Sequence, residues 1–157
     1  IRDRRGVDAF LQTVVDAIAD HAGGNLTADA LARLTPDQIT LWAYVILRDE
    51  LCDGGFIQLI HNGYGPFFFL NPFAKAMRLW GLKDFSKLLY RARELYELHA
   101  EALTQPCTDE EFMALYEQFP EFDDLDDAFM EREEEFTNGV AHYLDEHLTD
   151  FIDITHG

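Results

Sequence analysis

The side chains best suited to chemistry in this sequence are carboxylates, and they are concentrated near its end. Residues 124–135 hold seven acidic side chains and one arginine, a net of six negative charges over twelve residues. In a helix this stretch spans about 18 Å, or one charge per ~3 Å, and one DNA strand carries a charge every ~3.4 Å. A helix face with this charge density attracts positively charged proteins and repels nucleic acid and anionic membranes.

The distribution of charge along the whole chain supports this interpretation. Residues 1–105 carry 13 acidic and 11 basic side chains, a net of −2. Residues 106–157 carry 17 acidic side chains and one basic side chain, Arg132, which makes their net charge −16 and that of the chain −18. Charge that served solubility alone would be spread over the chain. We therefore expect an acidic C-terminal part, residues 106–157, that binds a basic protein rather than nucleic acid or a membrane.

The acidic residues occupy one face of a helix expected over residues 124–149. At about 100° per residue, its apolar side chains share one side: Leu125, Phe129, Phe136, Val140, Tyr143 and His147. On the opposite side we take five residues, called the acidic face below, as the candidate partner-binding residues: Asp124, Asp127, Glu131, Glu134 and Glu135. The alternative is a solvated helix face whose acids favour the positive end of the helix dipole, but that effect covers only the first turn.

The sequence lacks the usual motifs for catalysis and metal binding. Residues 123–127 lack the glycine of a calcium-binding loop, and the six histidines show neither His-Glu-x-x-His nor Glu-x-x-His spacing. Gly54-Gly55 and Gly63-x-Gly65 lack the Lys and Ser/Thr of a phosphate-binding loop, and Cys52 has no base near it in the sequence. We therefore expect no enzyme activity, no catalytic residues, no metal and no cofactor.

The elements that must position the acidic face are predicted to be helices. The sequence indicates an all-α, single-domain (residues 1–157), irregular bundle of about seven helices around a buried central helix at residues 39–52, which is apolar nearly all round. No strand alternation is evident. The expected helical segments are residues 7–22, 27–34, 39–52, 56–61, 72–80, 84–103, 109–118 and 124–149.

Helix starts and stops carry specific signals. A capping Thr followed by Pro and Gln begins the central helix at Thr35, and a capping box begins another helix at Thr108. Asn71-Pro72 predicts a start by the same logic, and Gly54-Gly55 predicts a break. The loop at residues 64–70 contains three consecutive Phe residues, which either insert into the core or form an exposed interface patch.

The cysteine content and the hydropathy of the sequence indicate where in the cell the protein is located. Two cysteines, Cys52 and Cys107, do not make a disulfide framework, so we interpret them as thiols in a reducing compartment. No run of 18 apolar residues predicts a transmembrane helix. We expect a soluble cytoplasmic protein.

Residues 49–65 carry a motif that resembles the bacterial DNA mimic protein 19 family. The family pattern is Glu-x-x-Asn-Gly-Gly-Phe-x-Gln-x-x-x-Asn-x-x-Gly, and the resemblance covers roughly residues 35–150. Asp53 replaces the usual Asn of the pattern. The matching residues are Glu50, Gly54, Gly55, Phe56, Gln58, Asn62 and Gly65.

We interpret this motif as a fold signature rather than an active site. The glycines permit a sharp turn, Phe56 would fill the core, and Gln58 and Asn62 could satisfy backbone groups freed at the turn. The resemblance implies that the acidic face imitates DNA phosphates and occupies the DNA-binding surface of a transcription factor, nucleoid protein or nuclease. The alternatives are an immunity-type protein that neutralises a basic toxin and a small metal-dependent enzyme. A homodimer would extend the charged surface.

Overall fold

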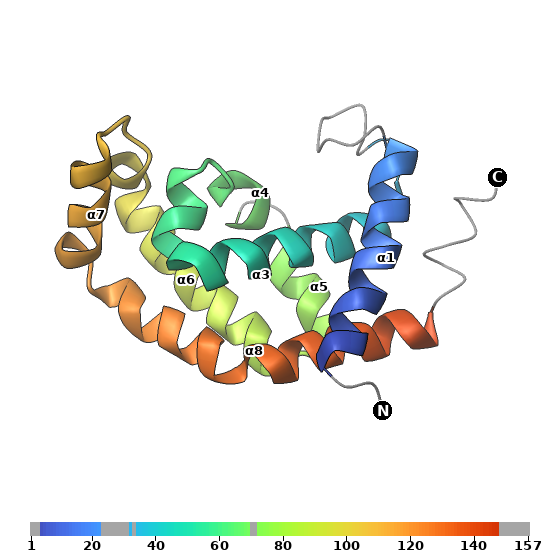
Figure 1. Cartoon of the computed structure of the whole chain (residues 1–157). Coiled ribbons are helices and arrows are strands. Elements are labelled where there is room, and N and C mark those ends of the chain that lie inside the picture. Colours follow the sequence, from blue (N-terminus) through green and yellow to red (C-terminus); the bar gives the residue numbers. More distant parts are fainter. Residues whose placement is uncertain (1–3, 23–31, 33, 70–71, 148–157) are drawn as a thin grey trace. The chain divides into compact units, whose positions relative to one another are not determined.

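The computed structural model describes residues 4–22, 32, 34–69 and 72–147. Within these ranges the chain is helical and contains no strand, which confirms the all-α prediction (Figure 1). The described helices are α1 (Arg4–Ala22), α3 (Pro36–His61), α4 (Gly65–Phe69), α5 (Phe73–Leu79), α6 (Lys83–Leu103), α7 (Asp109–Gln118) and α8 (Glu121–Glu146). None of these helices combines the length and hydropathy that crossing a membrane requires.

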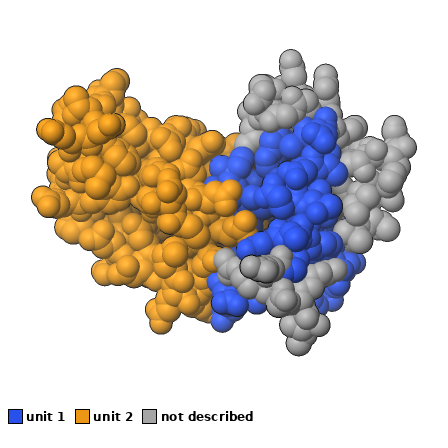
Figure 2. Space-filling model, in the orientation of Figure 1, with its two compact units in different colours: residues 1–46, 134–157 blue, residues 47–133 orange. Residues whose placement is uncertain are grey.

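Two compact units make up the chain (Figure 2). Unit 1 comprises residues 1–46 and 134–157, and unit 2 comprises residues 47–133. In unit 1, the Tyr44 hydroxyl and the Thr137 hydroxyl share a buried hydrogen bond of 2.7 Å. In unit 2, α5 packs on α6, where the buried Ser86 hydroxyl donates to the Ala74 carbonyl at 2.7 Å. The single-domain organisation stays a prediction.

The expected capping motifs begin two of the helices. At the start of α3, the backbone N–H of Thr35 donates to Gln38 Oε1 at 3.0 Å, and the backbone N–H of Gln38 donates to Thr35 Oγ1 at 3.2 Å. At the start of α7, the same reciprocal pair joins Thr108 and Glu111, with both distances 3.1 Å. Each pair satisfies two N–H groups that a helix start leaves without partners, which confirms both predictions.

Helix α3 contains the predicted buried helix and the predicted break. Residues 41–45 are at most 7% exposed, as is Leu47. The helix then kinks at Gly55, whose φ of 74° and ψ of −169° are not helical, and continues to His61. The two successive glycines therefore mark a kink, and the residues that follow them, such as Phe56 and Ile57, are again fully buried.

The expected loop at residues 64–70 is instead a short helix, α4, over Gly65–Phe69. Pro66 occupies its first turn, where the fixed φ of proline suits a helix start and the missing N–H costs nothing. Phe68 and Phe69 are 1% and 2% exposed, and Phe67 is half-buried. Of the two interpretations of this segment, core insertion is therefore the one that describes Phe68 and Phe69.

Other boundaries differ from expectation by a few residues. Helix α8 begins at Glu121, directly after Pro120 and earlier than predicted, while α5 begins at Phe73, after Pro72. Asn71, the expected cap of α5, and most of the helix expected over 27–34 lie outside the described residues.

Candidate protein-binding surface on helix α8

A line of buried side chains anchors α8. Its members recur every three or four residues and are at most 3% exposed: Phe122, Leu125, Phe129, Phe136, Val140 and Leu144. The predicted apolar side of this helix is thus confirmed at Leu125, Phe129, Phe136 and Val140. Tyr143 and His147, the other predicted members, are half-buried and stack with ring centroids 4.0 Å apart.

All five residues of the acidic face are exposed on α8. Asp124, Asp127 and Glu131 belong to unit 2, and Glu134 and Glu135 belong to unit 1. Their exposure leaves this face of the helix accessible to a partner protein. Their role in binding stays a prediction.

Two other acidic residues of α8 turn inward. Glu133 is 7% exposed, and Asp126 is half-buried with its Oδ1 accepting the backbone N–H of Phe56 at 2.8 Å. The pKa of Asp126 is raised to about 6, chiefly by burial; the hydrogen bond from Phe56 opposes this rise, and the charges of Asp123 and Asp127 contribute to it. The acids of α8 are therefore divided between an exposed face and an inner pair.

Sequence spacing places both members of that inner pair on the buried side of α8. Asp126 stands four residues after Phe122 and three before Phe129. Glu133 stands four residues after Phe129 and three before Phe136, so its position on the buried side could have been predicted. Asp126 bonds to a residue 70 positions away, and no local pattern reports such a contact.

Arg132, the only basic side chain of residues 106–157, bonds to an acid on another helix of unit 2. Its Nη1 lies 2.9 Å from Asp84 Oδ2 on α6. The hydrogen bond and the charge of Arg132 lower the pKa of Asp84. This arginine is thus directed to α6 by an ion pair that the sequence did not predict.

The fold-signature motif forms the kink of α3, and the kink explains its two glycines. A Cβ on Gly55 would collide with the Asp126 carboxylate, and the positive φ there also disfavours any other residue. A Cβ on Gly54 would lie 2.6 Å from Cδ of Gln58, whose side chain crosses this position. Phe56 is fully buried, as expected.

The polar residues of the motif bond differently from expectation. Gln58 Nε2 donates to Glu50 Oε2 at 2.7 Å and to Asp53 Oδ2 at 3.0 Å, and Asn62 Nδ2 donates to both Glu50 carboxylate oxygens at 3.1 and 3.2 Å. The prediction that Gln58 and Asn62 satisfy backbone groups at the turn is therefore wrong. Their amides reach along the helix surface to Glu50, because that carboxylate lies on the same side of α3.

Side chains of α7 and α8 satisfy the backbone groups at the kink instead. The Tyr116 hydroxyl donates to the Gly54 carbonyl at 2.7 Å, and Asp126 accepts from Phe56 as described. Burial, followed by the charge of Asp126, raises the pKa of Tyr116. Gly65, the last motif residue, is buried at the start of α4, where a Cβ would collide with the ring of Tyr96.

A cavity of about 350 Å³ adjoins the kink and contains side chains of the types that serve in catalytic and metal sites. Its lining includes His61, whose Nδ1 donates to the Leu103 carbonyl at 2.9 Å and whose Nε2 lies 3.8 Å from Cys107 Sγ. In the described part of the chain, no three His, Cys, Asp or Glu side chains are grouped as metal ligands. The cavity therefore offers a Cys–His pair but no set of metal ligands.

Comparison with known proteins gives two matches. The family model described as DMP19-like protein matches residues 32–147. The protein named DNA mimic protein DMP19 from Neisseria meningitidis serogroup B is 35% identical over 147 residues, which cover 93% of this chain and 88% of that protein. The matched range agrees with the resemblance that the motif at residues 49–65 indicated.

Proposed function

Since this chain belongs to the family of DMP19-like proteins, we propose that it binds the DNA-binding surface of a basic protein by imitating the phosphates of DNA. The partner is a transcription factor, a nucleoid protein or a nuclease. The chain acts by occupying that surface, so it needs no catalytic residue, metal or cofactor of its own.

The observation that carries this proposal is the exposure of the whole acidic face on a helix whose opposite side is buried. Acids on a disordered tail would have to be ordered upon binding, at a cost in conformational entropy. Acids on an anchored helix are already spaced at its regular rise of about 1.5 Å per residue. The five exposed carboxylates of this face occupy about 18 Å of helix, or one per ~4 Å. This spacing is close to the ~3.4 Å per charge of one DNA strand, so the face suits a partner surface that holds regularly spaced phosphates.

A second candidate function is neutralisation of one basic toxin by an immunity-type interface, and Met130 is the observation that favours it. This side chain is 50% exposed on α8 and stands one residue before Glu131. Specific interfaces draw most of their affinity from a few apolar or aromatic anchors rather than from rim charges. Substitution of Met130 by Ala therefore separates the two functions.

The first experiment is capture of a partner from host lysate on the immobilised chain, eluted stepwise with duplex DNA and then with salt. A DNA mimic releases its partner when DNA competes for the same surface. The released protein is then bound to a fluorescently labelled duplex, and the chain is titrated into this complex. Displacement of the duplex is followed by fluorescence anisotropy. DNA mimicry also predicts that direct binding of the partner to the chain weakens steeply as salt rises.

The decisive variants remove charge without changing shape. The test variant carries Asn or Gln at the five positions of the acidic face. A matched control removes five exposed acids elsewhere, at Asp16, Glu94, Glu101, Glu110 and Glu117. We expect the test variant to lose at least about tenfold in affinity, roughly 1.4 kcal/mol, and the control to lose much less.

Three outcomes discriminate between the functions. Equal loss in the two charge variants would mean that net charge, rather than the acidic face, drives binding, and would overturn the proposed site. Release of the partner only under denaturing conditions, with a large effect of Met130→Ala, would replace mimicry by the immunity-type function. Undiminished binding by the test variant would refute DNA mimicry by this face.

A further inference from the structure

Unit 2 contains a strongly basic stretch within this acidic chain. Residues 73–93, which cover α5 and the first half of α6, hold six of the 12 Lys and Arg residues and one acid, Asp84. Their net charge is +5, which leaves −23 for the rest of the chain. All six basic side chains are exposed: Lys75, Arg78, Lys83, Lys87, Arg91 and Arg93. Imitation of DNA requires negative charge, so the proposed function does not explain these basic residues.

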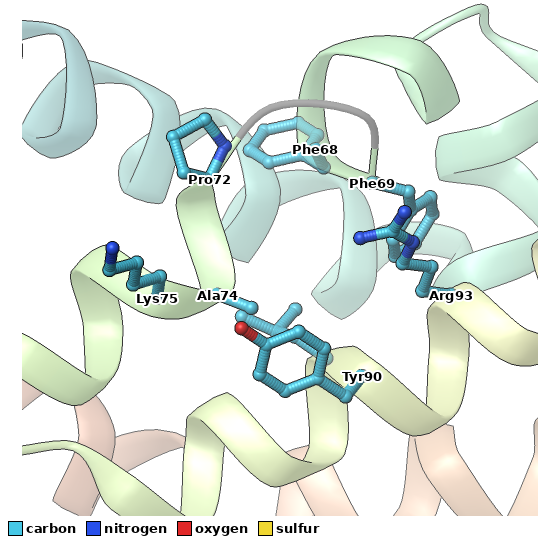
Figure 3. Close-up of a pocket in the computed structure, with 8 residues that line it drawn as sticks. Phe68, Phe69, Pro72, Ala74, Lys75, Tyr90 and Arg93 are labelled. Atoms are coloured by element: carbon cyan, nitrogen blue, oxygen red, sulfur yellow. The ribbon is translucent and has the colours of Figure 1, made fainter.

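A cavity of about 270 Å³ opens within this basic stretch, between α4, α5 and α6. Its apolar lining includes Phe68, Phe69 and Leu89, each at most 2% exposed. Its polar lining consists of Lys75 on α5 and of Tyr90 and Arg93 on α6 (Figure 3). None of the described residues that line the cavity is acidic. An aromatic interior with a cationic rim is complementary to a ligand that has an apolar body and a negative end.

The polar side chains on the rim have hydrogen-bond donors that are available to a ligand. Neither the Lys75 ammonium nor the Tyr90 hydroxyl makes a hydrogen bond or ion pair with any of the described residues. Arg93 uses its Nε to pair with Glu97 at 3.0 Å, and both side chains of that pair are about half exposed. Such an exposed pair contributes little, so the remaining guanidinium N–H groups can bind an anion without a large loss.

Figure 3 shows how these groups are arranged. Tyr90 projects from α6 with its hydroxyl directed toward α5, the helix that carries Ala74 and Lys75. Arg93 lies on the other side, beside Phe69. The donors therefore flank the cavity, and Phe68 and Phe69 form part of its wall.

We propose that this cavity binds a small organic carboxylate with a flat apolar body. The body lies against Phe68, Phe69 and Leu89, and the carboxylate accepts hydrogen bonds from the rim donors Lys75, Tyr90 and Arg93. At about 270 Å³ the cavity is slightly smaller than the 300–1,000 Å³ typical of sites for drug-sized ligands, which favours an acid of one or two rings. This site is separate from the acidic face and does not depend on the proposed function.

The test is titration calorimetry of the full chain with 2-naphthoate, an aromatic acid of this class, and with its neutral analogue 2-naphthamide. We expect saturable binding of the acid with one ligand per chain, at least tenfold tighter than the amide. The variant Lys75→Gln/Arg93→Gln should lose at least tenfold in affinity for the acid. Absence of binding to the wild-type chain, or equal binding of the amide, would overturn the proposal.

A matched control separates the rim from general charge. The variant Arg78→Gln/Arg91→Gln removes one exposed cation from α5 and one from α6, as the test variant does, but neither residue lines the cavity. It should bind 2-naphthoate within twofold of the wild-type affinity. An equal loss in both variants would show that the basic stretch attracts anions without a defined site. Far-ultraviolet circular dichroism of each variant establishes that the fold is retained.

Discussion

Asp126 offers the sharpest test of how α8 is held in place. Its charge can be removed by substitution with Asn while its hydrogen bond to Phe56 is kept. In Asp126→Asn the amide oxygen still accepts the backbone N–H of Phe56, but no charge is desolvated. A rise in pKa from 3.8 to about 6 corresponds to at most about 3 kcal/mol. Since the carboxylate is in part exposed to solvent, which screens its interactions, we reduce this to about 1–2 kcal/mol.

The direction of the pH dependence follows from proton linkage. Between about pH 4 and pH 6, folded Asp126 retains a proton that the unfolded chain has released, so its contribution to the free energy of unfolding falls as pH rises. Above about pH 6 both states are ionised and the destabilisation is complete. Below about pH 4 both are protonated and it is absent. Asp126→Asn should therefore be about 1–2 kcal/mol more stable than wild type near pH 7.5 and equal to it near pH 4.

Urea unfolding followed by circular dichroism across this pH range provides the measurement. The difference between variant and wild type removes the pH dependence that all other carboxylates share. Asp123→Asn, on an exposed neighbour, is the matched control and should change stability little. Asp126→Ala leaves the Phe56 N–H without its partner and should cost about 1–3 kcal/mol. An Asn variant that is as unstable as the Ala variant at neutral pH, or whose difference from wild type does not change with pH, would refute the reasoning.

Three further substitutions probe the kink and the caps. Gly55→Ala should destabilise the fold by at least about 2 kcal/mol, since φ of 74° is unfavourable for alanine and its Cβ meets a carboxylate; a melting temperature equal to wild type would contradict this. Tyr116→Phe removes the hydroxyl bonded to the kink carbonyl and should cost about 1 kcal/mol in urea unfolding, whereas an unchanged midpoint would show that water replaces it. Thr108→Ala should cost about 1 kcal/mol by loss of the α7 cap, and Thr108→Ser should restore most of it.

The sequence predicted the helix starts and the kink correctly where the interacting residues are close together in the chain. The capping pairs at Thr35 and Thr108 and the break at Gly54-Gly55 involve residues within four positions of each other, so spacing alone specifies them. The one-turn helix α4 was missed because five residues are too few to show helical periodicity. Pro66 was the available signal.

For the candidate site, too, the sequence predicted the features that depend on residues close together in the chain. Exposure of the acidic face follows from helical periodicity, since its residues are opposite the apolar side chains of α8. The bond between Asp126 and Phe56 and the bond between Arg132 and Asp84 depend on contacts between separate helices. The cationic rim of the small cavity likewise requires α4, α5 and α6 to be packed before Lys75 and Arg93 line the same opening.

The hydrogen bonds at the kink differ in the length of chain that each one closes, so we expect them to form at different stages of folding. The bonds of Glu50 to Gln58 and Asn62 close loops of 8 and 12 residues, whereas the bond between Phe56 and Asp126 closes one of 70. Short loops close with a smaller entropic cost and therefore form earlier during folding. Removing Glu50 should mainly slow refolding, and removing Asp126 should mainly speed unfolding, which stopped-flow kinetics of the two alanine variants can distinguish. We therefore predict that the motif at residues 49–65 begins to form before α8 docks, and that the docked helix determines the lifetime of the native state.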